Sequence, residues 1–168
     1  LGVSSRPSDM SFGVRCRRCG LEYSSVGLGG LFAQPSRWFS AGHWMMLTDI
    51  LRFFKRGRRA LAEGLPEGQP LGAFLRTGGH GDGLVRHFVL PMGAAIWSSS
   101  NADLMQFPAL SFLRFLDNHG LLRATGQPVW RTIVGGSVRY VTAIADRLGA
   151  GVRVAAPVTR VSRTAEGA

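Results

Sequence analysis

The chain has 168 residues, about the size of one domain of the usual roughly 100–200 residues. Hydrophobic residues make up 45% and charged residues 18%, which excludes a disordered chain because enough apolar side chain is present to form a core. The longest uncharged stretch, 87–102, contains a proline and several serines and is shorter than the roughly 20 apolar residues of a spanning helix. The sequence predicts no transmembrane segment. No secretory signal is recognisable, and two cysteines in one C-R-R-C do not suggest a disulfide framework, so we expect a cytoplasmic protein.

Positive charge is abundant and unevenly distributed. The net charge is +10, and 19 of the 20 basic residues are arginine. Residues 15–59 carry a net +7, residues 60–130 a net −1 and residues 131–163 a net +5. This balance is compatible with nucleic acid, anionic lipid or a phosphate-bearing ligand. We do not expect nucleic acid as the partner, because Arg-rich surfaces without one are common.

The N-terminal quarter is predicted to be irregular apart from one hairpin. Residues 1–9 contain a proline and three serines and are predicted as a loop. The runs 10–16 and 21–25 are β-prone and are separated by four residues, which predicts a hairpin. The glycine-rich segment 24–36 is predicted as a further loop.

The central part of the chain is predicted to be helical. Apolar residues recur at helical spacing over 37–62, and a glycine and a proline end this helix. A short helix is predicted over 70–76, and another over 83–90 that Pro91 breaks. A further helix is predicted over 108–118, closed by an Asn-His-Gly C-cap.

The character of the sequence changes near residue 125. A helix from about Ser137 ends in glycines, and the alternating segment 152–163 predicts two short strands hinged at Pro157. We therefore interpret residues 1–127 as a mostly helical domain with a small hairpin, and 128–168 as part of a layered α/β domain. The fold class expected is α/β, present as an α+β fragment.

The C-R-R-C motif formed by Cys16 and Cys19 has two possible chemical meanings. It could be half of a zinc site, but a structural zinc needs four ligands, and the four histidines are far apart in the sequence. It could be a redox dithiol, but that motif belongs at a helix start and not in a hairpin turn. The sequence favours a chance occurrence, and we expect no metal.

Catalytic motifs are absent from the sequence. The glycines of 27–30 lack the third glycine of a dinucleotide loop, and there is no nucleophile elbow, zinc-protease helix or phosphate-loop lysine. The acidic residues are scattered without a paired spacing. Such a chain is better suited to chemistry that a cofactor carries.

A few residues each allow a functional and a structural interpretation. His119 is either a ligand contact or proton carrier, or simply part of a helix C-cap. Trp97 and Trp130 either line an apolar pocket or belong to the core. The basic half of 37–62 is either a solvated face or a membrane-surface helix. The apolar anchors of such a helix would be Trp44, Phe53 and Phe54.

Several strings in the chain resemble a known family. They are PSDMSF (7–12), GLEYSS (20–25), TDILRFFKR (48–56), LPMGAAIWSS (90–99), FPALSFLRFLDNHGLL (107–122), PVWRTIVGGSVRYV (128–141) and the closing VRVAAPVTRVSRT. Together they resemble the flavin-containing amine oxidase superfamily, and within it the bacterial FAD/NAD(P)-binding oxidoreductases often found with cyclopropane fatty-acid synthases. The likeness runs over nearly the whole chain, in order.

The resemblance implies a mostly helical substrate domain inserted in a dinucleotide-binding FAD domain, of which only part is present here. Residues from about 10 to 127 match the substrate domain, and 128–168 match the return into the FAD domain. The Gly-x-Gly-x-x-Gly unit and the segment that closes over the flavin are not in this sequence, which suggests a fragment. The cysteine pair looks like a local departure from the family pattern.

The resemblance also suggests site residues. Pro157 and Val158 correspond to a position whose backbone lies beside the adenine of FAD. Trp97, His119 and Trp130 fall in strings near the substrate cavity, and no catalytic residue is assigned.

The leading hypothesis is an FAD-dependent oxidoreductase that transfers a hydride from an amine or lipid-type substrate to flavin. The alternative is a non-catalytic basic module that binds an anionic membrane surface or nucleic acid through 37–62. The third hypothesis is a degenerate remnant of such an enzyme, without activity.

Overall fold

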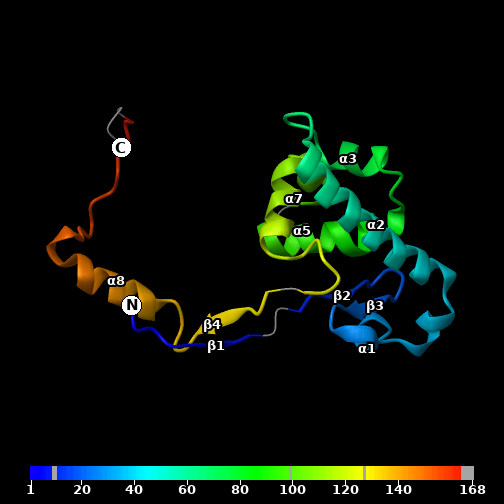
Figure 1. Cartoon of the computed structure of the whole chain (residues 1–168), viewed down its shortest axis with the longest axis horizontal. Helices are drawn as coiled ribbons and strands as arrows, with labels where there is room; N and C mark the ends of the chain where they lie inside the picture. Colours follow the sequence, from blue (N-terminus) through cyan, green and yellow to red (C-terminus); the bar gives the residue numbers. More distant parts are fainter. Residues whose placement is uncertain (9–10, 99, 127, 164–168) are drawn as a thin grey trace. The chain divides into compact units, whose positions relative to one another are not determined.

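The computed structural model describes residues 1–8, 11–98, 100–126 and 128–163. The chain divides into two compact units, one made of residues 1–9 and 129–168 and the other of residues 10–128. The second unit is thus inserted between the two segments of the first. Both units are shown in Figure 1. Among the described residues the fold is mixed α+β, mostly helical, with two small two-stranded antiparallel sheets.

The inserted unit begins with the predicted hairpin. Strands β2 (Gly13–Arg15) and β3 (Glu22–Ser24) pair antiparallel, with Val14 opposite Tyr23. This prediction is confirmed. Helices then follow in the order α1 (Gly27–Leu31), η1 (Pro35–Phe39), α2 (Ala41–Glu63), α3 (Leu71–Thr77), α4 (Asp82–Leu84), the π-helical η2 (Val85–Val89), α5 (Leu90–Trp97), α6 (Asn101–Gln106) and α7 (Ala109–Asn118).

One apolar core holds the inserted unit together. The long helix α2 contacts α4 and α7, and α3 contacts α6 and α7 (Figure 1). Burial of this apolar area is the main force that stabilises the unit. The large side chains that are fully buried are Phe53, Leu71, Phe74, Leu84, Val89, Leu104, Phe112, Leu113, Leu116 and Leu122.

The ends of α2 and α7 follow from their capping residues. The Ser40 side chain accepts a hydrogen bond from the His43 N–H, so α2 begins at residue 41 and not at 37 as predicted. Gly64, at φ +93°, ends α2 as predicted. His119 and Gly120, at φ +68°, end α7, which confirms the predicted C-cap.

Three further features of the inserted unit differ from the sequence analysis. The segment 24–36 is not all loop, because it contains α1 and the start of η1. Helix α6 was not predicted, since six residues carry too little periodicity to be recognised. Pro91 does not break its helix; the backbone passes through the π-helical turn η2 and continues as α5, where Pro91 occupies the first turn. Within this continuous helix the proline removes one backbone donor, the one that would pair with the His87 carbonyl oxygen in α-helical geometry.

The other unit is small and mostly exposed. Strand β1 (Ser5–Pro7) pairs antiparallel with β4 (Arg131–Ile133), so the N-terminal residues are not entirely loop as predicted. The Arg131 guanidinium donates to the backbone oxygen of Ser5 at 2.8 Å. The predicted helix is confirmed as α8 (Val138–Leu148), which the 3₁₀ turn η3 (Gly149–Gly151) follows.

The two strands expected in 152–163 do not form; the described residues of this segment belong to no sheet. A short strand is stable only when neighbouring strands pair with it, and the described chain supplies none here. The described residues also contain no parallel sheet of the kind that a dinucleotide-binding domain requires. No helix among the described residues has the length and apolar character needed to cross a bilayer.

Candidate functional site

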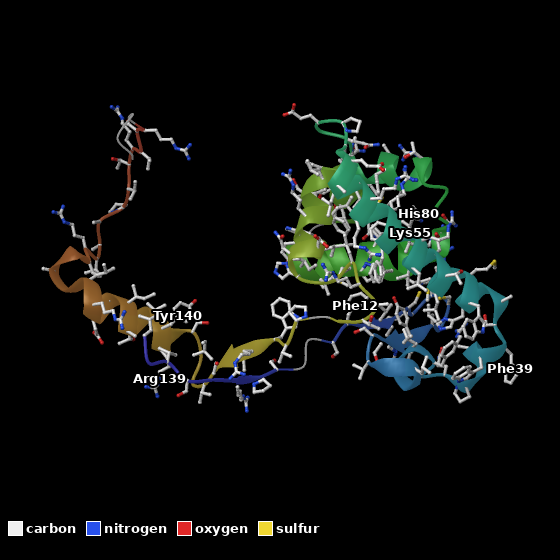
Figure 2. All side chains as sticks on the ribbon, in the orientation of Figure 1. Phe12, Phe39, Lys55, His80, Arg139 and Tyr140 are labelled. Atoms are coloured by element: carbon white, nitrogen blue, oxygen red, sulfur yellow. The ribbon has the colours of Figure 1, made fainter. Side chains whose placement is uncertain are left out.

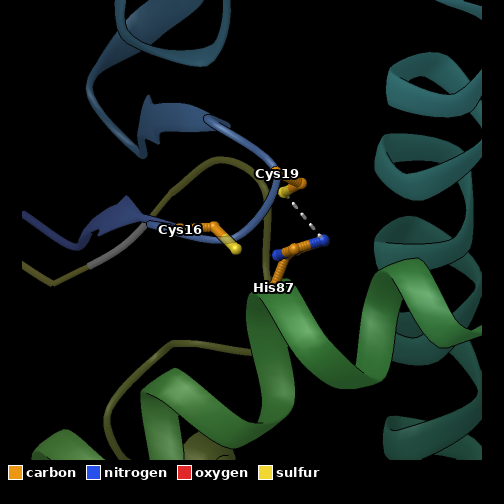
Figure 3. A group of neighbouring side chains, drawn as sticks. All are labelled: Cys16, Cys19 and His87. Atoms are coloured by element: carbon orange, nitrogen blue, oxygen red, sulfur yellow. Dashed lines mark hydrogen bonds between the residues drawn. The ribbon is translucent and has the colours of Figure 1, made fainter.

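The structure brings the two cysteines of the C-R-R-C turn next to a histidine that is distant in the sequence. Cys16, Cys19 and His87 each offer one ligand atom, and these atoms all lie within 4.8 Å of one another. The Cys19 Sγ lies 3.8 Å from the His87 Nε2 (Figure 3). Both thiols are free, with Cys19 exposed and Cys16 half-buried. The sequence did not predict this cluster, because 68 residues separate Cys19 from His87.

The hairpin turn fixes the positions of both cysteines. The Cys16 N–H donates to the Leu21 carbonyl oxygen at 2.8 Å, and the Gly20 N–H donates to the Cys16 carbonyl oxygen at 2.9 Å. Gly20 adopts φ +67°, a backbone conformation that residues other than glycine rarely adopt. The turn therefore folds back on itself and presents both thiols beside His87.

The π-helical turn η2 positions His87. Pro91 has no N–H to donate to the His87 carbonyl oxygen, its partner in α-helical geometry. The Tyr23 hydroxyl donates to this oxygen at 2.7 Å. Tyr23 is buried, and burial raises the pKa of its phenol, so the hydroxyl stays a donor. This bond from strand β3 holds the backbone of His87 at the hairpin.

The electrostatic surroundings favour the ligating form of two of the three groups. The backbone N–H of Cys19, the Cys19 thiol and the charge of Arg18 lower the pKa of the Cys16 thiol and so favour its thiolate. Burial and the charges of Arg86 and Arg37 lower the pKa of His87, which keeps its imidazole neutral.

A second histidine forms a buried polar contact inside the helical core. The His80 Nδ1 lies 2.8 Å from the Asp49 Oδ1, and the Gly81 N–H donates to the Asp49 Oδ2 at 2.8 Å. The His80 side chain is 1% exposed, and a Cβ on Gly78 would lie 2.8 Å from its Nε2, so the loop backbone covers the ring. The pair joins α2 to the loop before α4, and its inaccessibility indicates a structural role.

Two of the predicted pocket residues lie in one aromatic cluster. The ring centroids of Trp97 and Phe115 are 4.8 Å apart, and the Phe115 and His119 rings stack at 3.9 Å. The His119 Nδ1 also lies 2.8 Å from the Phe115 carbonyl oxygen. A surface hollow of about 360 Å³ beside the end of α2 is lined by other residues, among them Arg56. Trp97 and His119 therefore both pack against Phe115, with contacts typical of core and C-cap residues.

The remaining predicted site residues belong to the other unit. The Trp130 carbonyl oxygen accepts from the Ser8 N–H at 2.9 Å, next to strand β4. Pro157 and Val158 lie in an exposed segment outside the described sheets, and Val158 is 78% exposed. Among the residues that the structure describes, no contact around them identifies an adenine site.

The basic half of α2 is largely engaged within the chain. Arg56 lies over the Phe74 ring at 4.6 Å, Arg58 donates to the Leu122 carbonyl oxygen, and Arg59 pairs with Glu63 at 2.8 Å. Two of the proposed membrane anchors are in the core, since Phe53 is 0% and Phe54 9% exposed. The prediction that they contact a membrane was wrong, because they belong to the inward face of α2.

Comparison with known proteins found no matching family model, no matching curated protein and no matching solved structure. The likeness to the flavin-containing amine oxidases therefore depends on the sequence strings alone and stays a hypothesis.

Proposed function

We propose that this chain supplies the substrate domain and the adjoining segments of an FAD-dependent oxidoreductase that acts on an amine or a lipid-type substrate. The observation that carries the proposal is the insertion of the helical unit. The chain enters this unit after β1 and leaves it before β4, and these two strands pair with each other. The resemblance implies this arrangement for a substrate domain inserted in an FAD domain.

The exposed face of α8 supports a larger domain around it. Val138, Val141, Ile144 and Leu148 lie on one side of this helix and are 40–63% exposed. A helix with an uncovered apolar side is stable when another layer packs against that side. In an α/β domain that layer is a sheet. An FAD domain would provide it.

The described residues do not by themselves fit FAD. They contain no parallel sheet, and the segment around Pro157 and Val158 has no strand partner among them. What the chain offers is a helical body in which Trp97 and His119 both pack against Phe115, as candidates for lining a substrate cavity.

The test uses the complete open reading frame in which this sequence lies. The purified protein should release close to one FAD per chain on denaturation, and amine or fatty-acyl substrates should bleach the flavin without oxygen. Ile144→Asp should lower the flavin content, whereas Asp146→Asn, a change of one charge on the far side of α8, should leave it unchanged. A complete protein without flavin, or a reading frame without a Gly-x-Gly-x-x-Gly unit, would refute the proposal.

A second candidate function is binding to an anionic membrane surface, which one observation favours. Trp38, Phe39 and Trp44, around the start of α2, are 46%, 93% and 44% exposed. Phe39 projects away from the ribbon (Figure 2). Exposed aromatic residues beside a cationic side chain, here Arg37, are typical of interfacial binding.

This candidate is tested with vesicles of phosphatidylserine and of phosphatidylcholine. Binding should favour the anionic vesicles, weaken with salt and be lost in Phe39→Ser, whereas Leu51→Ser, an exposed site elsewhere on α2, should bind normally. Equal binding of both vesicle types would refute it.

A further inference from the structure

We propose that Cys16, Cys19 and His87 bind one zinc ion, with a water molecule as the fourth ligand. The site is independent of the proposed flavin chemistry. It lies wholly within the inserted unit, where the hairpin turn meets η2 (Figure 3).

The ligand distances are close to those of a tetrahedral zinc centre. Zn–S bonds of about 2.3 Å and Zn–N bonds of about 2.0–2.1 Å place two sulfurs about 3.8 Å apart, and a sulfur and a nitrogen about 3.6 Å apart. The Cys19 Sγ and the His87 Nε2 are 3.8 Å apart, and no pair of ligand atoms in the cluster exceeds 4.8 Å. The largest separation in the cluster is thus at most about 1 Å above that of a tetrahedral zinc centre, a difference that side-chain rotation can remove.

The ligand types point to zinc rather than to magnesium or calcium. Two thiolates and an imidazole are soft or borderline donors, whereas magnesium and calcium prefer oxygen ligands. Two thiolates also neutralise the charge of Zn²⁺, which suits a turn that already carries Arg17 and Arg18. The exposure of Cys19 provides an entry path for the ion.

Two backbone features support a built site. The Gly20 turn holds the thiols, and the Tyr23 hydroxyl, bound to the His87 carbonyl oxygen, holds the histidine. π-Helical turns are rare and occur frequently at functional sites. The ion would link the hairpin to the helical body, so binding should stabilise the inserted unit.

The first experiment measures metal uptake by the full chain. Reduced, metal-free protein is dialysed against zinc, and its metal content is determined by mass spectrometry. We expect one equivalent per chain. With Co²⁺ in place of zinc we expect a thiolate-to-cobalt charge-transfer band and the strong visible bands of a tetrahedral centre. Substoichiometric zinc uptake by the wild-type protein would overturn the proposal.

Variants assign the ligands. Cys16→Ser and Cys19→Ser should lose the charge-transfer band, and His87→Gln should bind zinc at least tenfold more weakly. Arg17→Ser, in the same turn, should keep one equivalent of metal. Circular dichroism of each variant verifies the fold. Zinc binding of wild-type strength in either cysteine variant or in His87→Gln would contradict the assignment.

Thiol reactivity gives a second measurement that needs no variant. Zinc should slow the alkylation of both thiols in the wild-type chain and should raise its denaturation temperature. If zinc leaves alkylation unchanged and the two thiols instead form a disulfide in air, the C-R-R-C turn is a redox dithiol and the zinc proposal is wrong.

Discussion

The hydrogen bond between Tyr23 and His87 yields the sharpest stability prediction. The Tyr23 hydroxyl donates at 2.7 Å to the His87 carbonyl oxygen, to which Pro91 has no N–H to donate. Tyr23 is only 5% exposed. Tyr23→Phe removes the hydroxyl, so the His87 carbonyl oxygen loses this hydrogen bond. The expected loss in the free energy of unfolding is about 1–3 kcal/mol, the cost of leaving this partly buried polar group unsatisfied.

The assay is urea denaturation followed by circular dichroism, with Tyr140→Phe as the control. The chain has only two tyrosines, and Tyr140 is 39% exposed on α8. A substitution at an exposed site should change the free energy of unfolding by less than about 0.5 kcal/mol.

A double-mutant cycle tests the role of the proline. Pro91→Ala supplies the missing N–H, so Tyr23→Phe should cost less in that background, with a coupling energy of about 0.5–3 kcal/mol. Additive effects, or a neutral Tyr23→Phe, would refute the reasoning.

The same bond predicts a dependence on alkaline pH. Burial raises the pKa of Tyr23 in the folded state above the ordinary value of about 10 that it has when unfolded. The unfolded state therefore loses this proton first, and the stability from the neutral phenol is present below pH ~10 and falls as the pH rises further. Tyr23→Phe should flatten this alkaline loss of stability, and Tyr140→Phe should not.

Two further substitutions test the packing of the core. Gly93→Ala would place a Cβ 2.6 Å from the Leu104 Cδ1 and 3.0 Å from its Cγ, so we expect a loss of about 1–3 kcal/mol in thermal denaturation despite the better helix propensity of alanine. Gly42→Ala, with nothing within 4 Å, is the control and should be neutral or stabilising; equal effects at both sites would contradict the predicted clash. Asp49→Asn should lower the free energy of unfolding by about 1–3 kcal/mol. The two carboxylate oxygens of Asp49 face the His80 ring and the Gly81 N–H, and an amide has only one oxygen to replace them. An unchanged urea midpoint would show that this buried pair contributes nothing.

Local patterns in the sequence were sufficient to predict the main elements. The hairpin, the C-terminal end of α2, the short α3, the α7 C-cap and α8 were all predicted, because each depends on neighbouring residues such as Gly64, Pro70 and Gly120. Hydrophobic periodicity and capping act within a few residues, so a single sequence displays them.

Contacts between distant residues were decided only by the tertiary structure. Strand β1 is recognisable only through its pairing with β4, and the expected strands of 152–163 lack partners among the described residues. Pro91 would normally end a helix, but here the helix continues through it, and the Tyr23 hydroxyl donates to the carbonyl oxygen that the proline leaves without its usual donor. The Cys16–Cys19–His87 cluster has the same origin. Its cysteines are visible in the sequence, but folding alone brings His87 to them, because hydrophobic packing sets which distant segments meet.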